Sequence, residues 1–144
     1  MSEKALKIIT IFAVGALCYG SMEIINRGFT HISMGILGGL SFLVIHILNG
    51  DYRNGNIRMI TLLIISALFI TSAEFFTGEL LNHILGMNIW SYSDMPLNID
   101  GQVCLPFTMI WFVLSVLGVI TDNFIRHKIF NEPAAEITAE RAAV

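Results

Sequence analysis

Four long apolar runs are the feature that most constrains the fold of this chain. Each run is close to the roughly 20 residues that a bilayer-spanning helix requires, and they cover residues 6–25, 31–49, 58–84 and 103–125. Only 13% of the residues are charged, whereas a soluble domain carries roughly 25%. The runs lack the alternation of strands, and a membrane barrel needs many more segments. The sequence therefore predicts an all-α membrane protein with four transmembrane helices over residues 1–130 and a flexible cytoplasmic tail over 131–144.

The start of the chain resembles a signal peptide, because a short charged segment precedes the first apolar run. That run is longer than the apolar core of a typical signal peptide, and no clear small-residue cleavage motif follows it. We therefore expect a retained helix. The two cysteines, Cys18 and Cys104, form no disulfide framework and are expected to be free thiols in apolar surroundings.

The basic residues predict the orientation of the chain. If both termini are cytoplasmic, seven of the eight Lys and Arg residues lie on the cytoplasmic side, and only Arg27 lies outside. The seven are Lys4, Lys7, Arg53, Arg58, Arg126, Lys128 and Arg141. Cytoplasmic loops of membrane proteins carry an excess of such residues. We therefore expect a multi-pass protein of the cell membrane with both termini in the cytoplasm.

Two carboxylates, Glu23 and Glu74, lie near the ends of apolar runs, where hydrocarbon cannot solvate them. They follow Lys7 and Arg58 at the same spacing, which corresponds to about 24 Å of helix for each. Both acids are therefore expected at a similar depth, in the outer part of the membrane. Each also sits in a similar local sequence of Ser, one residue, Glu and two apolar residues. This similarity suggests two helical hairpins related by a pseudo-two-fold axis.

Arg27 follows Glu23 by four residues, which is the favourable order for a helical ion pair. Its planar guanidinium can bridge two carboxylates. We therefore predict a charge cluster, for ligand binding or for structure, formed by Glu23, Arg27, His31 and Glu74. In the alternative interpretation, the ion pairs only lock the first helix to the third.

The segment between the third and fourth runs is unusually rich in polar and aromatic residues. It can act as a lid over the charge cluster, with Gln102 pointing inward, or as an interfacial aromatic loop in which Asp100 caps the fourth helix. Its candidate functional residues are Trp90, Tyr92, Ser93, Asp94, Asn98, Asp100 and Gln102.

Small residues recur at a spacing of four in the first two runs, as Ala16 and Gly20 and as Gly35 and Gly39, with Gly38 beside them. Such patterns let helix backbones approach closely. They indicate packing within the chain or a dimer interface.

Four segments together resemble the bacterial family called Putative ABC-transporter type IV, whose members are permease-like membrane proteins. They are Glu-Ile-Ile-Asn-Arg-Gly-Phe29, Glu-Phe-Phe-Thr-Gly78, Trp-Ser-Tyr-Ser-Asp94 and Pro-Leu-Asn-Ile-Asp-Gly-Gln-Val-Cys-Leu105. The resemblance covers most of residues 19–112. The loop in this family usually begins Trp-Asp-Tyr-Ser, and Ser91 replaces that aspartate here. The resemblance implies a bacterial multi-pass membrane protein, and it implies no particular substrate.

Three functions are compatible with these features. The first is a small transport or channel subunit whose charged site binds a cation, a proton or a polar solute. The second is an accessory protein whose outer loop contacts lipid headgroups, cell-wall precursors or a partner protein, with a purely structural charge cluster. The third is a membrane enzyme acting on lipid or glycan, but no catalytic motif supports it, so we expect no enzyme activity.

The expected partners follow from the same features. The chain contains no phosphate-binding G-x-x-x-x-G-K-[ST] motif, so an ABC transport role requires a separate ATPase subunit. Four spans are few for a permease, which favours a homo-oligomer in the lipid bilayer. No two histidines have metal-ligand spacing, so we expect no metal and no cofactor. The small net charge of −3 indicates no nucleic-acid partner.

Overall fold

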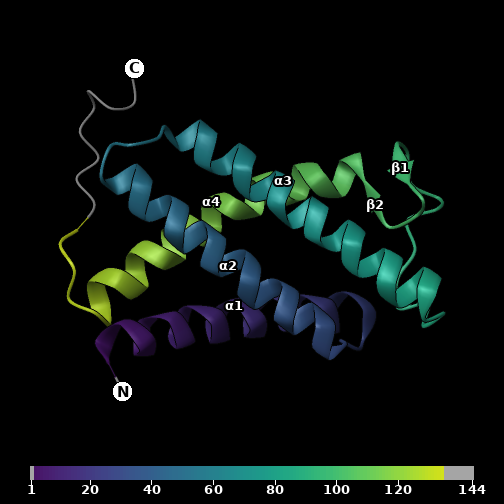
Figure 1. The fold of residues 1–144 in the computed structure, drawn as a ribbon, viewed down its shortest axis with the longest axis horizontal. Coiled ribbons are helices and arrows are strands. Elements are labelled where there is room, and N and C mark those ends of the chain that lie inside the picture. Colours follow the sequence, from purple (N-terminus) through teal and green to yellow (C-terminus); the bar gives the residue numbers. More distant parts are fainter. Residues whose placement is uncertain (1, 135–144) are drawn as a thin grey trace.

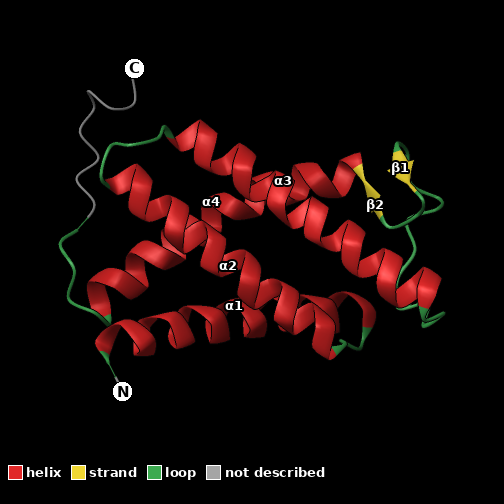
Figure 2. Ribbon diagram, viewed as in Figure 1, coloured by secondary structure: helices red, strands yellow, loops and turns green. Residues whose placement is uncertain are grey.

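Four long helices form the molecule in a computed structural model, which describes residues 2–134 (Figures 1 and 2). They are α1 (Glu3–Arg27), α2 (Ile32–Arg53), α3 (Met59–Gly78), which continues as the π-helical segment η1 (Glu79–Ile84), and α4 (Leu105–Lys128). Each of these four helices is long and apolar enough to cross a membrane. The prediction of four helices that are long and apolar enough to span a membrane is therefore confirmed. Arg141 and most of the predicted tail lie outside the described residues.

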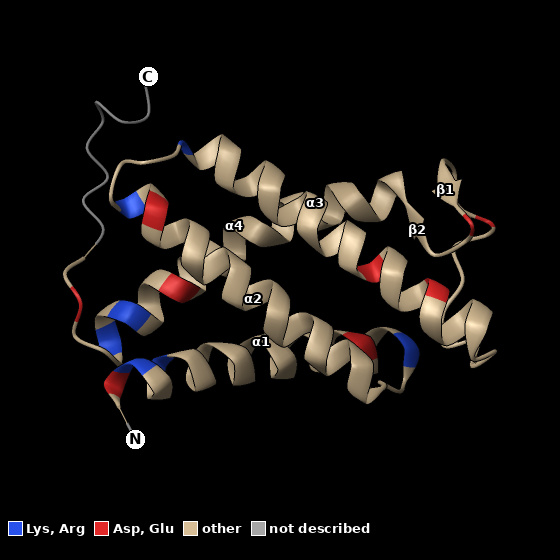
Figure 3. Cartoon of the chain, in the orientation of Figure 1, with Lys and Arg blue, Asp and Glu red and all other residues tan. Residues whose placement is uncertain are grey.

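The described chain begins and ends at the same end of the bundle (Figure 1). We call this the termini end, and it also holds the turn at 54–58. The opposite loop end holds the α1–α2 turn at 28–31 and the long loop of residues 85–104. Six of the seven described Lys and Arg residues belong to the termini end, and Arg27 belongs to the loop end (Figure 3).

Glycines let α1 and α2 pack in close contact. A Cβ atom added to Gly38 would lie 2.4 Å from Cβ of Tyr19 and 2.7 Å from the carbonyl oxygen of Gly15. One added to Gly35 would lie 4.0 Å from Cβ of Ala16, an ordinary contact. These small residues therefore pack within the chain, which was one of the two interpretations of their spacing. The contact also fixes where Tyr19 stands on the face of α1.

The long loop at the loop end contains a small antiparallel ladder that the sequence did not predict. Strand β1 (Asn98–Ile99) pairs with β2 (Val103–Cys104), with Asn98 opposite Cys104. The turn between them places Asp100 at a φ of 50° and Gly101 at 66°. Asp100 therefore lies in this turn and does not cap α4, whose N-cap residue is Cys104 without a side-chain hydrogen bond. The capping prediction for Asp100 is wrong because the ladder separates this residue from the helix.

Candidate functional site

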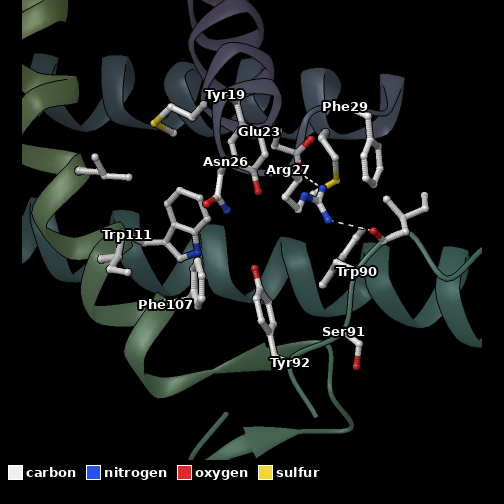
Figure 4. Close-up of a pocket in the computed structure, with 15 residues that line it drawn as sticks. Tyr19, Glu23, Asn26, Arg27, Phe29, Trp90, Ser91, Tyr92, Phe107 and Trp111 are labelled. Atoms are coloured by element: carbon white, nitrogen blue, oxygen red, sulfur yellow. Dashed lines mark hydrogen bonds and ion pairs between the residues drawn. The ribbon is translucent and has the colours of Figure 1, made fainter. Parts of the chain in front are cut away.

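A cavity of about 640 Å³ opens at the loop end between α1, α4 and the long loop (Figure 4). Its lining combines six aromatic rings with a short row of polar side chains from α1. The aromatic residues are Tyr19, Phe29, Trp90, Tyr92, Phe107 and Trp111, and the polar residues of α1 are Glu23, Asn26 and Arg27. This mixture is typical of a site for a small molecule, in which apolar walls surround a few polar groups.

The ion pair between Arg27 and Glu23 forms one side of the cavity (Figure 4). Arg27 also donates a hydrogen bond from Nη1 to the carbonyl oxygen of Ile89 at 2.9 Å, which ties α1 to the long loop. The second oxygen of Glu23 accepts a hydrogen bond from the Thr30 hydroxyl at 2.7 Å. Glu23 and Arg27 therefore neutralise each other and hold the loop in place.

Glu74 lies deeper than Glu23 and is 1% exposed. Its carboxylate accepts hydrogen bonds from the Tyr19 hydroxyl at 3.1 Å and from Trp111 Nε1 at 2.8 Å. Both donors are neutral. Within residues 2–134 no Lys, Arg or His forms an ion pair with Glu74. A buried carboxylate with only neutral donors is unusual, because buried charges are normally paired.

The predicted bridge from Arg27 to both acids is therefore wrong. Arg27 is one helical turn closer to the loop than Glu23, so its guanidinium reaches Ile89. Tyr19 is one turn deeper than Glu23, and its hydroxyl reaches Glu74 instead. His31 does not join the cluster either, since its ring caps α2 and accepts a hydrogen bond from the backbone N–H of Ser33.

The Tyr19 and Trp111 rings separate this cavity from a second one. The rings stack with their centroids 5.4 Å apart. The second cavity, of about 530 Å³, also lies between α1 and α4, and its lining is more apolar. Both cavities share four lining residues, which are Tyr19, Met22, Trp111 and Leu114. Glu74 accepts a hydrogen bond from each residue of this stacked pair, so its carboxylate sets the position of the two rings that lie between the cavities.

Buried amides attach the long loop to the bundle. Asn82 of η1 donates from Nδ2 to the carbonyl oxygen of Trp90 at 3.1 Å and to Oε1 of Gln102 at 2.8 Å. Its own Oδ1 accepts from the backbone N–H of Ile89 at 2.6 Å. Gln102 is buried, as expected, and packs so closely on Gly78 that an added Cβ would lie 2.3 Å from Oε1.

The aromatic residues of the loop face inward. Trp90 is 8% exposed and donates from Nε1 to the carbonyl oxygen of Gln102 at 3.0 Å. Tyr92 stacks on Phe107 and points its hydroxyl into the cavity (Figure 4). Burial, together with the nearby charge of Glu74, raises the pKa of Tyr92 above its usual range. The hydroxyl therefore remains protonated and can donate a hydrogen bond to a bound molecule.

The other predicted loop residues shape the loop itself and do not line the cavity. Asn98 donates to the carbonyl oxygen of Met95 at 2.8 Å and accepts from the N–H of Gly101 at 3.1 Å. Ser93 pairs with Ser91, and Asp94 is exposed. Asp100 accepts a hydrogen bond from Gln102 through its backbone oxygen.

Three important residues of the site escaped prediction, namely Tyr19, Asn82 and Trp111. Two signals were present in the sequence. Tyr19 precedes Glu23 by one helical turn, and the indole N–H of a tryptophan within an apolar run requires a buried acceptor. Asn82 carried no comparable signal, because its role depends on the path of the long loop.

Four apolar helices and an aromatic cavity with a few polar groups at one end define a multi-pass α-helical membrane protein. The family model described as Putative ABC-transporter type IV matches residues 9–140, and the chain belongs to this family. The resemblance found in the sequence is thereby confirmed. No curated protein and no solved structure matches the chain.

Proposed function

We propose that this protein is the membrane-embedded, solute-binding subunit of a transport system, and that it binds a small positively charged organic solute in the cavity at the loop end. The observation that carries the proposal is Glu74, a buried carboxylate without a cationic partner in the described chain, behind a wall of aromatic rings. Intramembrane acids that face a protein interior commonly mark substrate or ion pathways.

The chemistry of the cavity favours a cation. Glu23 and Arg27 neutralise each other, which leaves the charge of Glu74 for the solute. Aromatic faces attract cations through their quadrupoles, most strongly where water is excluded. Asn26, Ser91 and the Tyr92 hydroxyl add neutral polar groups that can orient the solute. The stacked Tyr19 and Trp111 rings would then act as a gate that opens when the solute replaces them at Glu74.

The orientation and assembly belong to the same proposal. The concentration of Lys and Arg at the termini end supports cytoplasmic termini, and in that orientation the cavity would lie at the outer side of the bacterial cell membrane that we propose as its location. A homo-oligomer would supply more spans, and a separate ATPase would supply the energy. The relation of α1–α2 to α3–α4 by a pseudo-two-fold axis remains a prediction.

Tryptophan emission tests the proposal directly, because the chain has two tryptophans and both line the cavity. The probe is benzyltrimethylammonium, titrated into the purified protein in an uncharged detergent, with neutral benzyl alcohol as the comparison. We expect saturable quenching by the cation and at least about tenfold weaker binding to Glu74→Gln, since a desolvated charge interaction exceeds 1.4 kcal/mol.

Glu79→Gln is the matched control, because Glu79 pairs with His83 and does not line the cavity. This variant should bind the probe as the unaltered protein does. Equal affinity of Glu74→Gln and Glu79→Gln for the cation would refute the proposed site.

One observation favours the alternative of an accessory protein. The tip of the long loop exposes two large apolar side chains, Leu97 at 73% and Ile99 at 59%. These residues, rather than the buried Trp90, would contact lipid headgroups, a cell-wall precursor or a partner protein. Replacing both with serine should then abolish cell-level function while the cation titration remains unchanged. Normal function of the double variant would exclude this alternative.

A further inference from the structure

The two hydrogen-bond partners of Glu74 differ in one chemical respect. The Tyr19 hydroxyl lies 3.1 Å from Oε1 of Glu74, and Nε1 of Trp111 lies 2.8 Å from Oε2. An indole N–H can only donate, whereas a phenolic oxygen can both donate and accept. Oε2 is therefore restricted to accepting from Trp111, but Oε1 can carry a proton and donate it to the Tyr19 oxygen.

The surroundings of Glu74 favour such a proton. The residue is 1% exposed, and no Lys, Arg or His among residues 2–134 forms an ion pair with it. The polar and ionisable side chains around it are Tyr19 and Glu23 from α1, Trp111 from α4 and Tyr92 from the long loop. In the same core cluster, α2 contributes the apolar Met34 and Leu37. Glu23 is already paired with Arg27. Burying an isolated carboxylate is so costly that such a group is normally neutralised.

The position of Tyr19 gives this proton a route out of the core. Tyr19 lines both cavities, and Figure 4 shows the hydroxyls of Tyr19 and Tyr92 directed toward the same space inside the loop-end cavity. A phenol that accepts a proton from Oε1 can release its own proton on the cavity side. The carboxyl group can therefore exchange protons with the cavity while it stays buried.

We propose that Glu74 carries a proton when the cavity holds no cation, that a bound cation displaces this proton, and that the Tyr19 hydroxyl relays it. In this step the O–H bond of Glu74 breaks as an O–H bond forms at Tyr19. The original O–H bond of Tyr19 breaks, and that proton passes through the cavity to water. The inference rests on the proposed cation site and names the proton as its competing occupant.

Proton release on binding is the first test, with benzyltrimethylammonium as the probe and the purified protein in an uncharged detergent. A pH indicator in weakly buffered solution should report release of about one proton per bound probe. Quenching of tryptophan emission measures the binding in the same samples. On the acid side, the Kd of the probe should rise by about tenfold for each unit that the pH falls, because one proton competes for the site.

Infrared difference spectra assign the proton to its residue. A protonated carboxyl group has a C=O stretching band that an ionised one lacks, so adding the probe should remove such a band. Glu74→Gln should lack this band from the start. Glu79→Gln is the matched control, because Glu79 does not line the cavity, and it should retain both the band and its loss on binding.

Tyr19→Phe tests the relay, since it keeps the ring and removes only the hydroxyl. The band of Glu74 should move to higher frequency, because the O–H group loses its acceptor. Stopped-flow measurement should show proton release at least about tenfold slower, since a positioned proton carrier has been removed. Tyr52→Phe is the matched control, because Tyr52 lines neither cavity. Its band and its rate should equal those of the unaltered protein.

The outcomes separate this inference from the proposed function. Quenching by the probe without proton release would overturn the inference and leave the cation site standing. Absence of quenching would overturn both. If Tyr19→Phe releases its proton as fast as Tyr52→Phe does, the relay through Tyr19 is wrong.

Discussion

Gly38→Ala should destabilise the bundle, although alanine is the better helix former. The new Cβ would lie 2.4 Å from Cβ of Tyr19 and 2.7 Å from the carbonyl oxygen of Gly15. Carbon atoms prefer about 3.5–4.0 Å, so α1 must move away from α2 by more than about 1 Å. Overpacking of this kind costs about 1–3 kcal/mol. The same movement stretches the hydrogen bond from Tyr19 to Glu74, which adds about 1–2 kcal/mol.

The expected loss is therefore about 2–5 kcal/mol, reduced by up to about 1 kcal/mol of gained helix propensity. Gly35→Ala is the matched control one turn away, because its Cβ meets Ala16 at 4.0 Å. Unfolding in mixed micelles with increasing sodium dodecyl sulfate, followed by tryptophan emission, measures both variants. If Gly38→Ala and Gly35→Ala unfold at the same detergent fraction, the close contact of α1 with α2 is refuted.

Two further predictions concern the two ends of the bundle. Gly78→Ala should displace Gln102 and release the long loop, so the emission of Trp90 should shift to the red. Gly50→Ala is the control and should leave the emission unchanged, because its added Cβ would lie 3.6 Å from its nearest neighbour, Nη2 of Arg126. An unshifted spectrum in Gly78→Ala would contradict the packing of Gln102. Burial raises the pKa of Glu132, but hydrogen bonds from Lys7 and Arg126 outweigh it and hold the pKa below its usual value of 4.5. The stability that the Glu132 ion pairs contribute is therefore present above pH 4.5 and is lost as the pH falls further. The free energy of unfolding of Glu132→Gln should consequently decrease less on acidification than that of the unaltered protein.

The sequence was sufficient for the helices and for the general position of the site. The lengths of the apolar runs predicted each span to within a few residues, because the thickness of a bilayer sets both the length and the composition of a spanning helix. The cost of burying a carboxylate singled out Glu23 and Glu74, and both lie at or next to the cavity.

The partners of those acids were beyond the sequence. Spacing along α1 predicted the pair of Glu23 with Arg27, which is a contact within one helix. The partners of Glu74 come from α1 and α4, so they depend on how far each helix is rotated about its axis. Periodicity does not fix this rotation when a helix is apolar on every side. The hydrogen bonds of Asp122 in α4 with His46 and Asn49 were missed for the same reason, since these two residues belong to α2.

The π-helical segment η1 makes the attachment of the long loop depend on the number of residues in α3. The hydrogen bonds of a π-helix span one residue more than those of an α-helix, so each of its turns contains more residues. Deleting one residue between 79 and 84 would let α3 continue as an ordinary helix and would rotate whatever follows by about 100°. Asn82 would then turn away from Ile89 and Trp90, although every partner residue was still present. A homologous sequence that aligns with a one-residue gap here should therefore have its loop seated differently, even if the cavity residues are identical.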